Sequence, residues 1–135
     1  MSALVYIAGP YAAETPEDRA ENVRRIGILS RHAIALGLTP VSVHAAVGAG
    51  HLGRDDVPEE RERGLQAACR LAAWVGKSGG HFWFLRKDDG YKSDGTRREF
   101  HAYINNALPG KFLVGGTWKE LEERMANPDP KWRMG

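Results

Sequence analysis

Short apolar runs alternate with longer segments whose apolar residues recur at helical spacing, and this alternation most constrains the fold. The apolar runs predict buried strands, and strands that alternate with helices are typical of a parallel sheet covered on both faces. We therefore predict an α/β fold, a doubly wound, Rossmann-like parallel sheet of 4–5 strands. The predicted strands are 4–8, 38–44, 81–85 and 111–114, and the predicted helices are 16–36, 58–75, 96–106 and 118–125.

The chain of 135 residues has the length of one domain, which we expect to span 1–126 and to be followed by an extended tail, 127–135. A net charge of +2 does not favour a nucleic-acid partner. The single cysteine, Cys69, excludes an intramolecular disulfide and a cysteine-based metal cluster, and we expect it to be buried. Without a signal-peptide pattern or a membrane-spanning apolar segment, we expect a cytoplasmic protein without a membrane partner.

Three polar, glycine-rich loops follow predicted strands, at 9–15, 44–57 and 86–96. Ligands of parallel α/β sheets bind at the carboxyl ends of the strands, so these loops are the predicted binding region. In the first loop, Gly9 would let a ligand approach the backbone, and Tyr11 could stack on a base. At the end of the second strand, His44 could contact a sugar or base, although a loop histidine without a chemical role fits equally well.

The third loop leads into a helix through Ser93, Gly95 and Thr96. Backbone N–H groups at a helix N-terminus favour phosphate, and the Ser93 hydroxyl can donate to the same oxygens. Glu99 follows about one turn later, where we expect a carboxylate that stays ionised and suits a nucleophile. By spacing alone, a solvated first-turn glutamate is the simpler interpretation.

Three motifs resemble the nucleoside 2-deoxyribosyltransferase superfamily. Tyr6–Tyr11 is similar to its opening strand and loop, Pro40–His44 to its second strand, and Ser93-x-Gly95-x-x-x-Glu99 to the segment with its catalytic glutamate. The resemblance covers residues 4–114. It implies that Glu99 attacks the anomeric carbon of a nucleotide or nucleoside, and that the glycosyl-enzyme ester is then resolved by water or a second base.

Within that superfamily, Ser93 favours one group of members. The resemblance implies that transferases acting on free nucleosides carry Asp at this position, whereas monophosphate N-hydrolases carry Ser. An Asp would repel a phosphate dianion, so we expect a 5′-monophosphate substrate, with Arg97 or Arg98 adding positive charge. The resemblance also implies a homodimer or higher homo-oligomer, and we expect neither a cofactor nor a metal.

One departure concerns the group that would handle protons. Related hydrolases place an Asp in the helix before the third strand, whereas the second half of the helix predicted at 58–75 has no carboxylate. Glu60, Glu62, Asp88 or Asp89 could substitute for it. A deoxyribosyltransferase and a non-catalytic nucleotide-binding module therefore remain alternatives, and a nucleic-acid-binding domain is a more remote one.

Overall fold

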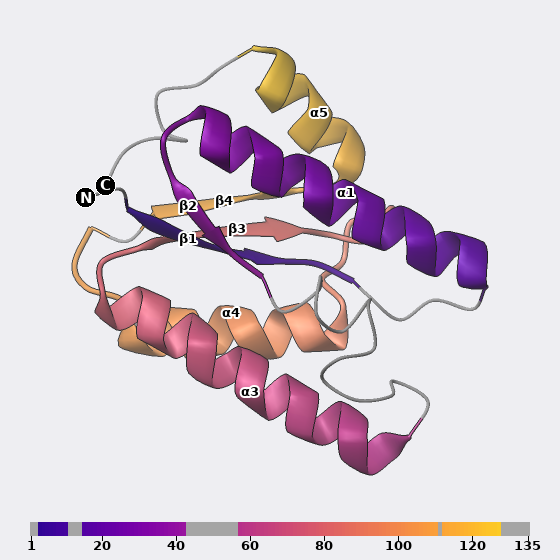
Figure 1. Cartoon of the computed structure of the whole chain (residues 1–135), viewed down its shortest axis with the longest axis horizontal. Coiled ribbons are helices and arrows are strands. Elements are labelled where there is room, and N and C mark those ends of the chain that lie inside the picture. The colour runs from indigo at the N-terminus through magenta and orange to yellow at the C-terminus, as the bar shows by residue number, and fades with distance from the viewer. Residues whose placement is uncertain (1–2, 11–14, 43–56, 111, 128–135) are drawn as a thin grey trace.

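The computed structural model of the chain describes residues 3–10, 15–42, 57–110 and 112–127, with only the backbone described at 112 (Figure 1). Strands and helices alternate along these residues, as predicted. The elements are β1 (Leu4–Ala8), α1 (Pro16–Ala35), β2 (Thr39–Val41), α3 (Pro58–Lys77), β3 (His81–Leu85), α4 (Asp94–Asn106), β4 (Phe112–Gly116) and α5 (Trp118–Ala126).

The described strands form one parallel sheet of four strands in the order β2-β1-β3-β4. This confirms the predicted α/β fold. Since β1 and β3 are neighbours, with Ala8 opposite Phe84, their carboxyl ends lie side by side in the centre of the sheet. The segments that follow them therefore begin close together, as the binding-region hypothesis requires.

Helices cover both faces of the sheet: α1 and α5 lie on one face, and α3 and α4 lie on the other (Figure 1). Alternate residues of the central strands point to opposite faces, so Ile7 packs towards α1 while Tyr6 packs towards α3 and α4. Among the described residues, no helix is long and apolar enough to cross a membrane.

The second strand is shorter than predicted. β2 spans only Thr39–Val41, because Leu38 instead completes the end of α1, where its N–H donates to the Ala33 carbonyl at 2.9 Å. Gly37 precedes it with φ 83°, a conformation that favours glycine at a helix end. Pro40 is accommodated because β2 is an edge strand. The remainder of the predicted strand, 43–44, lies outside the described residues.

Two other boundaries also differ from the sequence prediction. α4 begins at Asp94 rather than near Thr96, since Ser93 acts as its N-cap. β4 continues through Gly115 and Gly116 instead of ending at 114. A side-chain Cβ at Gly115 would lie 2.1 Å from the Phe84 ring, so the absence of a side chain there makes room for that ring.

Candidate functional site

Glu99 lies in the second turn of α4 and is 3% exposed, with its side chain against the sheet. The Tyr6 hydroxyl, from the middle of β1, donates a hydrogen bond to Glu99 Oε2. Tyr6 is itself fully buried and stacks on Phe82 of β3. The interpretation of Glu99 as a solvated first-turn glutamate is therefore wrong, because the fold turns its carboxylate into the layer between the sheet and the helices α3 and α4.

The second carboxylate oxygen of Glu99 is directed back towards the start of α4. A Cβ at Gly95 would lie 3.8 Å from Oε1 and 3.0 Å from Leu65 Cδ2 on α3. Within the part of the chain that the structure describes, Oε1 accepts no hydrogen bond. The carboxylate is thus held by one oxygen, and the other faces the first turn of α4.

Burial raises the pKa of Glu99 to about 7, and the hydrogen bond from Tyr6 opposes this rise. The expectation that Glu99 stays ionised is therefore wrong: at neutral pH its charged and neutral forms are similarly populated. The pKa of Tyr6 is raised well above its usual value, first by burial and then by Glu99, so Tyr6 remains a hydrogen-bond donor. A carboxyl group with a pKa near 7 is suited to functional proton or nucleophilic chemistry.

Cys69 of α3 is the other titratable neighbour of this pair. Its side chain is partly exposed rather than buried as predicted. Burial of part of the thiol and the proximity of Glu99 both raise its pKa, and Cys69 contributes in turn to the raised pKa of Tyr6. Glu99 is therefore flanked by an uncharged hydroxyl and an uncharged thiol.

The N-terminus of α4 is capped by Ser93. Its Oγ accepts the Thr96 N–H at 3.2 Å and donates to the Thr96 hydroxyl at 2.7 Å. Thr96 is completely buried, so this pair fixes the first turn of the helix. The Ser93 hydroxyl, predicted to donate to phosphate, thus donates to Thr96 in this structure. In the first turn, the N–H groups of Asp94 and Gly95 have no acceptor within the helix and are the ones that an anion could bind.

The remaining predicted binding residues lie in the first two loops. Gly9 is buried, and a Cβ there would lie 2.8 Å from Ile26 Cδ1 and 3.1 Å from Leu85 Cβ. The side-chain position at Gly9 is thus taken up by the core under α1, and glycine is required for packing there. Close approach of a ligand to its backbone stays a prediction. Tyr11 and His44 lie outside the described residues.

A scan against protein-family models matched residues 3–112 to a domain of unknown function, DUF7768. The chain belongs to this family. No curated protein and no solved structure matched it. The DUF7768 segment includes all the described site residues, from Tyr6 and Gly9 on β1 and its exit to Glu99 on α4.

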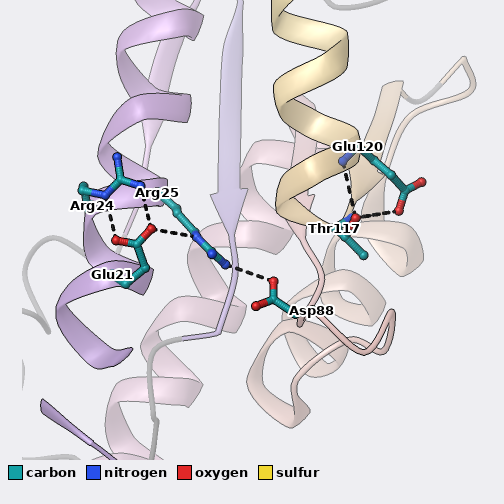
Figure 2. A network of polar contacts seen from close by, with 6 residues as sticks. All are labelled: Glu21, Arg24, Arg25, Asp88, Thr117 and Glu120. Carbon is teal, nitrogen blue, oxygen red and sulfur yellow. Dashed lines mark hydrogen bonds and ion pairs between the residues drawn. The ribbon is translucent and has the colours of Figure 1, made fainter. Parts of the chain in front are cut away.

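Two of the acidic residues that were predicted to substitute for an aspartate in the helix before β3 form ion pairs elsewhere. Glu62 accepts two hydrogen bonds from Arg98, at 2.6 and 3.0 Å. Asp88 pairs with Arg25 of α1 at 3.1 Å, and Figure 2 shows the Arg25 side chain extending between Glu21 and Asp88. Two further candidates remain: Asp89 lies 3.6 Å from the Lys87 ammonium, and Glu60 lies in the first turn of α3.

Arg97 and Arg98 do not act as a pair. Arg98 is neutralised by Glu62, whereas Arg97 is exposed. A role for Arg97 at phosphate stays a prediction. Across residues 3–10, 15–42, 57–110 and 112–127, no three His, Cys, Asp or Glu side chains converge on a point where a metal could bind.

Tyr6 is part of the predicted opening motif, but no role was predicted for it. A signal was present, because a tyrosine within an otherwise apolar buried strand usually has a hydrogen-bond partner for its hydroxyl. The identity of that partner required the tertiary structure, since 93 residues separate Tyr6 from Glu99.

Proposed function

We propose that this protein hydrolyses the N-glycosidic bond of a nucleoside 5′-monophosphate, with Glu99 as the nucleophile. The observation that carries the proposal is the buried Glu99 carboxylate, which is held at Oε2 by Tyr6 and accepts no hydrogen bond at Oε1 from any described residue. A structural glutamate in this position would be expected to pair with a cation or fill its hydrogen-bonding capacity. Among residues 3–10, 15–42, 57–110 and 112–127, nothing hydrogen-bonds to Oε1, which faces the first turn of α4.

In the proposed reaction, Glu99 Oε1 attacks C1′ of the sugar and displaces the base, which gives a glycosyl ester. Water then attacks C1′ and releases the sugar phosphate, as in retaining glycosidases. Tyr6 orients the attacking group through Oε2. Only the ionised form of Glu99 attacks, so the pKa of about 7 sets the fraction of competent enzyme.

The 5′-phosphate is assigned to the first turn of α4. The free N–H groups at a helix N-terminus bind anions, and the positive end of the helix dipole adds to the attraction. Ser93 caps this turn and Gly95 lies in it, where a Cβ at Gly95 would lie 3.8 Å from Glu99 Oε1. A substrate that spans Ser93 and Glu99 would therefore follow the N-terminal part of one helix.

A panel of ribo- and deoxynucleoside 5′-monophosphates, analysed by chromatography for free base, tests the proposal. Base release without an acceptor indicates hydrolysis, and a new nucleoside formed only with an added base indicates transfer. Glu99→Ala should lower the rate at least about 1,000-fold, as loss of a nucleophile usually does. The matched control is Glu123→Gln on α5, an exposed glutamate whose loss should leave the rate unchanged. Binding without turnover would identify a nucleotide-binding module instead.

The resemblance to deoxyribosyltransferases also leads us to propose a homodimer or higher homo-oligomer with no cofactor, working in the cytoplasm. Light scattering coupled to size-exclusion chromatography measures the oligomeric state directly. A mass of one chain at micromolar concentration would contradict that part of the proposal.

A further inference from the structure

The loop between β3 and α4 forms a closed turn before the helix begins. The Lys87 N–H donates to the Tyr91 carbonyl at 2.9 Å, and the Gly90 N–H donates to the Lys87 carbonyl at 2.8 Å. Gly90 has φ 91°, a conformation that glycine adopts without strain. The residues on either side of this turn are Arg86 and Lys92, which we call the loop cations. The turn brings their backbones next to each other at the carboxyl end of β3.

Both loop cations lie over the ring of Phe84, close to the end of β3. The Arg86 guanidinium and the Lys92 ammonium are each 5.5 Å from the centroid of this ring. The Lys92 ammonium is also 4.3 Å from the ring of Phe100 on α4, which meets the Phe84 ring edge to face. A cation within about 6 Å of an aromatic ring is attracted to it, so these contacts hold both side chains in place. The fold thus fixes two positive charges on one aromatic surface.

The two carboxylates of the same loop contact other cations. Asp88 pairs with Arg25 of α1 at 3.1 Å, and Asp89 lies 3.6 Å from the Lys87 ammonium. The Nε of Arg86 is buried, and within the described part of the chain no group accepts a hydrogen bond from it. A buried guanidinium donor usually has an acceptor, so this N–H is suited to an anionic ligand.

Two further carboxylates lie near this loop, and each has other partners. Glu120 of α5 accepts hydrogen bonds from the Thr117 N–H and hydroxyl, at 3.1 and 3.0 Å. Arg86 adds a smaller attraction that helps to lower the pKa of Glu120. Asp94, in the first turn of α4, is exposed and helps to raise the pKa of Arg98. These carboxylates therefore offset the charge of the loop cations only in part.

We propose that Arg86 and Lys92 bind the 5′-phosphate of the substrate as a dianion, next to the first turn of α4. The assignment of this phosphate to the substrate rests on the proposed function. Lys92 directly precedes the cap residue Ser93, so the loop cations and the N–H groups of Asp94 and Gly95 lie at the same end of the sheet. A phosphate monoester carries about 1.5 to 2 negative charges at neutral pH, which two cations match.

The loop cations are better placed for this role than the two arginines of α4. Arg98 is neutralised by Glu62, and Arg97 is exposed on the body of the helix. The unpaired N–H groups at the start of a helix point towards a ligand beyond that end. The loop cations precede α4 in the chain, on the side that these N–H groups face. Since a phosphodiester carries one negative charge and a nucleoside none, we expect this site to favour phosphate monoesters.

Binding of inorganic phosphate to the full chain tests the inference without any turnover. The rise in melting temperature with phosphate concentration, at constant ionic strength, gives the Kd. Lys92→Met and Arg86→Met keep apolar length over the rings but lose the charge. Each should raise this Kd at least about tenfold, as the loss of a hydrogen bond to a charged group does. Lys92→Arg should retain binding. The control is Lys77→Met, at the exposed end of α3, which changes the net charge equally and should leave the Kd unchanged.

Turnover of the nucleotides that the protein cleaves supplies a second measurement. The parent should have a higher kcat/KM for a nucleoside 5′-monophosphate than for the methyl ester of that phosphate, which carries one charge. In Lys92→Met this preference should fall at least about tenfold, through KM rather than kcat. A merely structural role of Lys92 would lower kcat/KM for both substrates by the same factor.

The outcomes separate this inference from the proposed function. If the Kd for phosphate is the same in the parent, Lys92→Met and Arg86→Met, or if the parent binds no phosphate, the inference is overturned and the N-glycosidase is untouched. A loss of binding in Lys77→Met as large as that in Lys92→Met would mean that net charge alone attracts the anion, and would also overturn it. If the loop cations bind phosphate but no nucleotide of the panel releases its base, the phosphate site stands and the proposed function fails.

Discussion

The Tyr6 hydroxyl donates to Glu99 Oε2, which joins the first strand of the sheet to the helix that follows its third strand. Both side chains are buried, and burial raises the pKa of each. The hydrogen bond lowers the pKa of Glu99 while burial raises it. This pair therefore sets both the stability of the protein as a function of pH and the proposed reactivity.

Replacement of Glu99 by glutamine should stabilise the protein at pH 8. In the folded state the Glu99 pKa is about 7, compared with 4.5 for an ordinary glutamate, so the folded protein holds this proton more tightly. Its contribution to stability is complete below about pH 4.5 and is lost as the pH rises to about 7. The difference corresponds to about 3 kcal/mol, at about 1.4 kcal/mol per pH unit. Urea unfolding of Glu99→Gln and the parent at pH 4.5 and pH 8 measures it.

The stabilisation of Glu99→Gln should nearly vanish at pH 4.5, where the parent carboxyl is protonated in the folded state and half protonated in the unfolded state. Glu123→Gln, at an exposed position of α5, supplies the control and should show no such trend. A Glu99→Gln variant that is equally stable to the parent at pH 8 would mean that the carboxylate is not desolvated.

Tyr6→Phe should move the pH profile of kcat/KM to higher pH. For the proposed nucleophile, kcat/KM of the parent rises with pH through about 7 and then levels off, as Glu99 loses its proton. Without the Tyr6 hydrogen bond, which lowers the pKa of Glu99, the rise should shift upwards. Cys69, whose pKa is raised in part by Glu99, and the Arg98–Glu62 pair, which acts on the same thiol, are unchanged in this variant.

Tyr103→Phe is the matched control for Tyr6→Phe. Tyr103 is also fully buried on this face of the sheet, but its hydroxyl donates to the Gly80 carbonyl at 2.7 Å. Loss of this bond should cost about 1–3 kcal/mol of stability, because the carbonyl is left without its partner. The pH profile could shift upwards in Tyr103→Phe as far as in Tyr6→Phe. That result would mean that a looser fold, and not the loss of the Tyr6 hydrogen bond to Glu99, raises the pKa.

Ser93→Ala should weaken the binding of nucleoside monophosphates more than it weakens the fold. Ser93 caps α4, and loss of a side-chain cap costs about 1 kcal/mol. Thr117→Ala removes the equivalent cap of α5, where Thr117 and Glu120 form the reciprocal bonds drawn in Figure 2. Thermal unfolding should place the two variants close together, whereas calorimetric titration with a monophosphate should show weakened binding for Ser93→Ala alone. Equal affinities of the two variants for the monophosphate would show that its 5′-phosphate does not bind at the N-terminus of α4.

Alanine at two glycines should have opposite effects on stability. At Gly9 the new Cβ would lie 2.8 Å from Ile26 and 3.1 Å from Leu85, and such overpacking costs about 1–3 kcal/mol. At Gly27, within α1, nothing lies within 4 Å of the Cβ position. Gly27→Ala should therefore stabilise the protein by up to about 1 kcal/mol, since alanine favours helix over glycine. Denaturant midpoints of both variants check the sign, and a stabilising Gly9→Ala would show that the site is not packed as described.

The sequence was sufficient for the arrangement of strands and helices, because apolar periodicity and end signals are local. Pro16 at the start of α1, Gly37 after its end and Thr117 at the cap of α5 all lie where the pattern indicated. The predictions that were wrong concern the ends of strands, where contacts with another helix or strand decide the boundary. Leu38 was assigned to a strand but bonds to α1, and Gly115 was excluded from a strand because the ring of Phe84 that covers it could not be foreseen.

The same division holds for the candidate site. The spacing from Ser93 to Glu99 is local, so the sequence could place a hydroxyl group and a carboxylate near the start of one helix, although it did not identify Ser93 as the cap. The burial of Glu99, its bond to Tyr6 and its raised pKa depend on packing α4 against β1 across 93 positions of chain. Desolvation is a property of everything that surrounds a group, and no stretch of sequence contains that information. The local pattern thus determined where the site residues lie along one helix. Tertiary packing alone decided how far the Glu99 carboxyl group is protonated at a given pH.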